Sequence, residues 1–91
     1  MAAQLYFFES PSCEACQEAA PAVDQLQREA MGRLFVVRLN PFIFDWNIGG
    51  FRPKSTPSYL MLDDKKRRVS KVEGRGLSLK ELQAMLAEAE Q

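Results

Sequence analysis

The sequence predicts an α/β protein with a four-stranded mixed β-sheet and helices on both faces of that sheet. Three observations lead to this prediction. Four short segments have strand-like patterning, a helical stretch directly follows the first of them, and a second helical stretch ends the chain. A length of 91 residues corresponds to one domain, residues 1–91.

The first strand and the first helix are adjacent in the chain. Residues 4–8 are apolar and rich in aromatic side chains, which indicates a buried strand, and residues 10–12 (Ser-Pro-Ser) end it and offer a helix N-cap. Apolar residues then recur at helical spacing from residue 13 to about residue 31. Pro21 should kink this helix because it removes a hydrogen bond and clashes one turn back. Gly32 is suited to ending it.

Three further strands are expected. Residues 34–39 form the second strand, residues 58–62 the third and residues 68–73 the fourth, with a polar Asp-Asp-Lys-Lys turn at residues 63–66 between the last two. A right-handed βαβ unit followed by an antiparallel hairpin gives a mixed sheet.

The last helix has the clearest start signal. Ser78 and Glu81 are three positions apart and fit a capping box, in which each side chain satisfies a free backbone N–H at the helix start. The helix then carries an apolar face made of Leu79, Leu82, Met85, Leu86 and Ala89. With a short helix expected at residues 45–48, the order of the elements is βαβαββα.

The connection at residues 40–55 is rich in aromatic side chains and is the hardest segment to interpret. We expect most of these rings to be buried in the core, and the alternative is that they line a groove for a partner. The four residues are Phe42, Phe44, Trp46 and Phe51.

Charge and hydropathy exclude several classes of protein. Twelve Lys and Arg residues balance twelve Asp and Glu residues, so neither a nucleic acid nor an anionic membrane is the expected partner. We interpret the basic run at residues 65–68 as a solvated hairpin turn beside Asp63 and Asp64 rather than as a nucleic-acid patch. No apolar run approaches the roughly 20 residues needed to span a bilayer, so we expect no membrane span.

The cellular compartment is only partly indicated. The chain has no basic start followed by an apolar stretch, and hence no recognisable signal peptide. We therefore expect a cytoplasmic location, while a periplasmic or secreted mature form stays open.

Cys13 and Cys16 are the only cysteines, and they stand between the first strand and the first helix. Free N–H groups and the helix dipole at a helix start stabilise a thiolate, which is the nucleophile in disulfide exchange. Cys13 is nearer to the helix start and to solvent, so it is the expected attacking thiol. Cys16 points along the buried face and is the expected resolving thiol.

Other uses of the two cysteines are possible. A structural disulfide is one. A zinc site needs four ligands, and the chain has no histidine and no other cysteine, so only a site shared across a dimer stays open. A carrier module for copper or an iron–sulfur cluster is a further alternative, since soft thiolates suit both metals.

Several motifs make the chain resemble the thioredoxin superfamily over nearly its whole length, and thioredoxin itself more than glutaredoxin. The matching residues are Cys13 and Cys16, Ala20-Pro21, Gly32-Arg33-Leu34, Arg38-Leu39-Asn40, Thr56-Pro57, and Val72, Gly74, Leu77 and Ser78. The family's first strand and helix are missing. Ser12 replaces a tryptophan, Glu14-Ala15 replaces Gly-Pro, and Phe7 stands where the family has a buried acid.

The resemblance implies a thioredoxin-like fold and a thiol–disulfide oxidoreductase that acts on protein disulfides. It implies that Thr56–Pro57 is a cis peptide and that Ser12, Thr56, Pro57 and Gly74 contact the substrate. The cysteines carry the electrons, so no cofactor is expected, and a reductase or a second thiol protein must recycle the chain. We expect a monomer that reduces rather than oxidises its substrates. A glutaredoxin-like activity with glutathione is the alternative enzyme.

Overall fold

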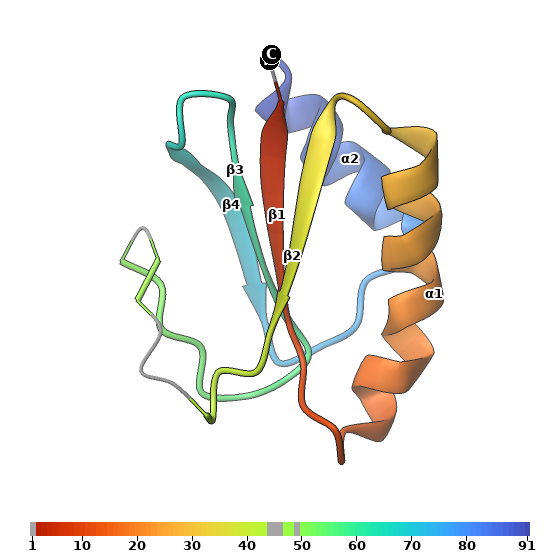
Figure 1. Cartoon of the computed structure of the whole chain (residues 1–91), viewed down its shortest axis with the longest axis vertical. Coiled ribbons are helices and arrows are strands. Elements are labelled where there is room, and N and C mark those ends of the chain that lie inside the picture. The colour runs from red at the N-terminus through yellow and green to blue at the C-terminus, as the bar shows by residue number, and fades with distance from the viewer. Residues whose placement is uncertain (1, 44–46, 49) are drawn as a thin grey trace.

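A computed structural model describes residues 2–43, 47, 48 and 50–91 of the chain. Its strands form one mixed sheet in the order β2-β1-β3-β4 (Figure 1). All four predicted strands and the two long helices are confirmed, with small shifts at the ends of the first strand and the first helix. The elements are β1 (Ala3–Phe8), α1 (Glu14–Glu29), β2 (Leu34–Leu39), β3 (Ser58–Leu62), β4 (Arg68–Glu73) and α2 (Leu79–Ala89).

Strand β1 lies inside the sheet and pairs on both sides. It runs parallel to β2, with Tyr6 opposite Val37, and antiparallel to β3, with Tyr6 opposite Leu60. A parallel pair needs a crossover connection, and α1 supplies it. The carboxyl end of β1 therefore leads directly into the start of α1, which is where the two cysteines stand.

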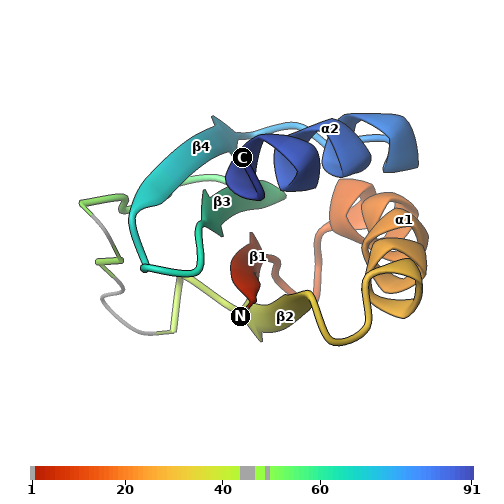
Figure 2. The same ribbon diagram turned by 90° about the horizontal axis from the view of Figure 1, so that it is seen from above.

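Both described helices cover the same face of the sheet (Figure 2). Side chains alternate along a strand, so Leu5 and Phe7 of β1 point toward the helices. They pack there against Val23 and Leu26 of α1 and against Leu82 of α2, in the main core of the protein.

On the opposite face of the sheet, a buried side chain from the connection between β2 and β3 packs against the strands. Phe51 is 3% exposed and packs edge-on against Phe8, with 5.7 Å between the ring centroids. Leu60 and Leu62 complete this second cluster. The expectation of helices on both faces is therefore corrected for the described residues, because the two helices described pack into the core on one face and Phe51 packs against the other. Two residues of the short helix expected at 45–48, Asp45 and Trp46, lie outside the described part of the chain.

Of the aromatic residues of this connection, most of which were expected to be buried, Phe51 is buried and Phe42 is exposed. The Phe42 side chain is 59% exposed. Its backbone N–H donates to Asn40 Oδ1 at 3.0 Å, and this tight turn after β2 holds the ring at the surface. Phe44 and Trp46 lie outside the described residues.

The start of α2 has the predicted capping box. Ser78 Oγ accepts a hydrogen bond from Glu81 N at 3.2 Å, and Glu81 Oε1 accepts one from Ser78 N at 3.0 Å.

No helix in the described part of the chain is long and apolar enough to cross a membrane.

Replacing Ser78 by alanine should destabilise the fold by about 0.5–2 kcal/mol, because a free N–H at the start of α2 loses its partner. Urea unfolding of the wild type and of Ser78→Ala measures this difference. Ser78→Thr, which keeps a hydroxyl group, is the matched control and should retain most of the stability. Equal midpoints for the wild type and Ser78→Ala would contradict the prediction.

Candidate redox site

Cys13 and Cys16 form a disulfide at the first turn of α1. Cys13 is the N-cap of this helix, and its Sγ accepts a hydrogen bond from Cys16 N at 3.0 Å. The turn before it is closed by a hydrogen bond from Cys13 N to Ser10 O at 3.2 Å. The two sulfur atoms are thus placed by local structure, a tight turn followed directly by a helix start.

The two cysteines differ in their access to solvent. Cys16 is 1% exposed, whereas Cys13 is only partly buried. The difference follows from helix geometry, because Cys16 lies on the face of α1 that packs toward the sheet and Cys13 precedes the helix. A disulfide with one accessible sulfur and one buried sulfur can be attacked from one side only.

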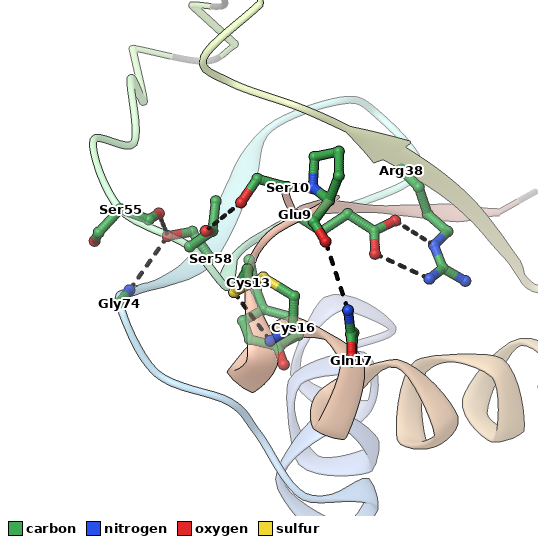
Figure 3. Close-up of a disulfide and its surroundings, with 12 residues drawn as sticks. Glu9, Ser10, Cys13, Cys16, Gln17, Arg38, Ser55, Ser58 and Gly74 are labelled. Atoms are coloured by element: carbon green, nitrogen blue, oxygen red, sulfur yellow. Dashed lines mark hydrogen bonds and ion pairs between the residues drawn. A yellow bond between two sulfur atoms is a disulfide. The ribbon is translucent and has the colours of Figure 1, made fainter.

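The segment before β3 lies beside the disulfide (Figure 3). Its Thr56–Pro57 peptide bond is cis. The Oγ1 atom of Thr56 lies 3.3 Å from Ser10 Oγ, which stands three residues before Cys13. Ser58 Oγ donates to Ser55 O at 2.6 Å and stabilises the turn. The contact between Thr56 and Ser10 joins this segment to the loop that leads into Cys13.

Gly74 fixes the other end of this segment. Its N–H lies 3.0 Å from Pro57 O and 3.2 Å from Ser58 Oγ (Figure 3). Gly74 has a φ of +83°, and a Cβ atom there would lie 3.0 Å from Ser55 Oγ, so both the backbone conformation and the space favour glycine. A hydrogen bond therefore joins Gly74 to Pro57, and Thr56 directly precedes Pro57 in the chain. Ser12 is exposed and directly precedes Cys13.

An ion-pair cluster beside the disulfide was not predicted from the sequence. Arg38 on β2 makes two hydrogen bonds to Glu9, with Nε 2.6 Å from Oε2 and Nη2 3.0 Å from Oε1. Its Nη1 lies 2.9 Å from Asp24 Oδ1 on α1. The hydrogen bond to Glu9 is the main reason why the pKa of Arg38 is raised above its ordinary value. The guanidinium also lies over the Phe7 ring, 5.5 Å from its centroid.

This cluster borders a pocket of about 450 Å³ next to the disulfide. Glu9 and Arg38 line it, and so does the buried Cys16. The remaining lining residues are Ser10, Pro11, Gln17, Leu39, Asn40 and Ile43. One signal in the sequence could have suggested the ion pair. Glu9 directly follows β1 and Arg38 is near the end of the parallel strand β2, and the carboxyl ends of parallel strands lie at the same edge of a sheet.

For the metal-carrier alternative, the described part of the chain offers no cluster of additional metal ligands. No group of three or more His, Cys, Asp and Glu side chains there could hold a metal ion. A metal ion or cluster bound by the two thiolates would need further ligands from another molecule.

By sequence, the chain matches no protein-family model and no curated protein. By structure, it is similar to a malarial protein with a TM-score of 0.82, at 19% identity and with 98% of each chain covered. It is similar to chloroplastic thioredoxin z with a TM-score of 0.80, at 20% identity, covering 98% of this chain and 79% of that one. The germline-specific thioredoxin Deadhead of Drosophila melanogaster has a TM-score of 0.78 at 21% identity, covering 96% of this chain and 80% of that one.

The chain has the thioredoxin fold. The β1–α1, β2–β3 and β4–α2 connections lie at the same end of the sheet (Figure 1). The first leads into the cysteine pair at the start of α1, the second ends in the cis Thr56–Pro57 peptide, and the third begins with Gly74. Sequence identities of about a fifth support a shared fold only. The chemistry has to be argued from the residues of this chain.

Proposed function

We propose that this chain is a thiol–disulfide oxidoreductase that acts on protein disulfides through Cys13 and Cys16. The observation that carries the proposal is the disulfide at the start of α1, with an accessible Cys13 and a buried Cys16. A helix start favours the thiolate form of a cysteine, and a second thiol three residues away can resolve the mixed disulfide made by the first.

The reaction runs from the dithiol form. The Cys13 thiolate attacks a substrate disulfide, so a Cys13–substrate bond forms and one substrate sulfur leaves as a thiolate. Cys16 then attacks Cys13 Sγ, which forms the Cys13–Cys16 disulfide and releases the second substrate sulfur. The substrate gains two electrons and the chain loses two. A reductase or a second thiol protein then returns the chain to the dithiol form.

Substrate binding is proposed for the segment beside the disulfide. An extended substrate strand can pair with the backbone at Thr56 in the manner of an added β-strand. Pro57 and Gly74 hold this backbone in place through the hydrogen bond from Gly74 N to Pro57 O. Ser12 is exposed next to Cys13 and is proposed to contact the same substrate.

The proposed activity is tested by reduction of insulin with dithiothreitol as the electron source. The chain should accelerate precipitation of the insulin B chain above the rate with dithiothreitol alone. A chain in which both cysteines are replaced by serine is the matched control. No acceleration by the intact chain would contradict the proposal.

We further propose that the chain reduces rather than oxidises its substrates. Glu14 stands between the cysteines in the first turn of α1, and the positive charge of Arg38 is paired with Glu9 and Asp24. Negative charge near Cys13 makes its thiolate less stable, and a less stable dithiol form gives a more reducing couple. The reduction potential should therefore lie nearer to about −270 mV than to about −120 mV.

Equilibration with glutathione and dithiothreitol buffers measures this potential. Glu14→Gln should shift the couple toward more oxidising values, whereas Glu88→Gln on α2 should leave it unchanged and serves as the control. A wild-type couple more oxidising than about −180 mV would contradict the electrostatic argument.

A further inference from the structure

The pocket beside the disulfide offers a place to which the buried thiol of Cys16 can pass a proton. Cys16 is 1% exposed, and it is one of the residues that line this pocket of about 450 Å³. A thiol in buried surroundings resists ionisation, and only the thiolate attacks a disulfide. Cys16 therefore needs a proton acceptor before it can resolve a mixed disulfide, and the pocket has room for bridging water.

Among the described residues that line this pocket, Glu9 alone carries a carboxylate. Its carboxylate is held in a fixed position by two hydrogen bonds from Arg38 (Figure 3). Arg38 is in turn held by Asp24 and by the face of the Phe7 ring. Phe7, the β1 residue under this cluster, cannot take a proton.

We propose that Glu9 accepts the proton of Cys16 through water in this pocket and that Arg38 is the residue that positions Glu9. The inference rests on the proposed function and adds a residue that the Cys-x-x-Cys motif does not include. In the step, the Cys16 S–H proton moves through water to Glu9, and the sulfur electron pair attacks Cys13 Sγ. The Cys13–Cys16 bond forms, the bond between Cys13 and the substrate breaks, and its electron pair leaves with the substrate sulfur.

The charges around the pocket allow a sharp test, because two roles of Glu9 predict opposite effects. The charged groups are Glu9 after β1, Arg38 on β2, and Asp24 and Glu14 on α1. From β3, the nearest titratable side chain on the helix-covered face is Tyr59, which packs against Phe7. If Glu9 acted only as a nearby negative charge, removing it would favour the Cys16 thiolate and speed up resolution. If Glu9 accepts the proton, removing it slows resolution.

The experiment follows the attack of Cys16 on a mixed disulfide at Cys13 directly, with 5,5′-dithiobis(2-nitrobenzoate) as the disulfide reagent. Cys13 of the reduced chain attacks this reagent and releases one coloured thiolate, and Cys16 then releases the second in a step that does not depend on protein concentration. In Glu9→Gln, the second release should slow by about a hundredfold or more below neutral pH, the low end of the effect of a general base. The deficit should grow as the pH falls, because hydroxide then has to replace Glu9. The first release should stay close to the wild-type rate.

Two variants serve as controls. Glu9→Asp keeps a carboxylate and should recover most of the second release, and Glu18→Gln removes an exposed carboxylate elsewhere on α1 and should leave both releases unchanged. A second release in Glu9→Gln that is as fast as in the wild type, or faster, would overturn the proposal. The assay needs no protein substrate, so this outcome is distinct from a failure of the insulin test.

Discussion

Replacing Cys13 by serine is expected to abolish the disulfide reductase activity of the chain. Cys13 is the more accessible sulfur, and its place before α1 lets the free N–H groups of the helix start stabilise its thiolate. A serine hydroxyl has the same shape but stays protonated at neutral pH, so it cannot attack a disulfide. The insulin assay should show no rate above that of dithiothreitol alone.

Cys16→Ser separates attack from resolution and is the matched control. This variant keeps the Cys13 nucleophile, so it should form mixed disulfides that accumulate because no second thiol resolves them. Mass spectrometry of the chain after mixing with an oxidised peptide should show the adduct on Cys13. Equal insulin reduction by Cys13→Ser and the wild type would end the redox assignment.

Phe51→Ala is expected to be strongly destabilising, although Phe51 lies outside the main core. The ring is 3% exposed, meets Phe8 edge-on and lies under Lys71, whose Nζ is 5.4 Å from the ring centroid. Removing a buried phenylalanine side chain costs about 3–5 kcal/mol. A chain of this length has a free energy of unfolding near the low end of about 5–15 kcal/mol. The variant should therefore lose a large part of that free energy.

Phe42→Ala is the matched control, because it removes the same side chain from the same connection. Its ring is 59% exposed, so the free energy of unfolding should change by no more than about 0.5 kcal/mol. Urea unfolding followed by circular dichroism measures both variants. Similar losses in the two would show that Phe51 does not seal the second face of the sheet.

The Phe51 variant should also affect the redox site. Phe51 anchors the connection that continues into Thr56 and Pro57 beside the disulfide. Loss of this anchor should weaken substrate binding, so the concentration of insulin needed for half-maximal rate should rise at temperatures where the variant is still folded.

The amino-acid sequence by itself determined the features that depend on neighbours in the chain. The capping box at Ser78 and Glu81 is made by residues three positions apart, and the placement of Cys13 and Cys16 depends on a strand, a turn and a helix start in succession. The four strands were predictable for the same reason, because their patterning is readable over five or six residues.

Only the tertiary structure decided the features that depend on residues far apart in the chain. Arg38 and Glu9 are 29 positions apart and meet because β1 and β2 pair in parallel. Phe42 and Phe51 have the same side chain, and the sequence does not distinguish the exposed ring from the buried one. Burial is a property of the assembled sheet and of what lies against it, so a pattern of local residues cannot specify it. The pocket that joins Cys16 to Glu9 exists for the same reason, since its walls come from the loop after β1, from α1, and from β2 and the residues that follow it, after these have packed together.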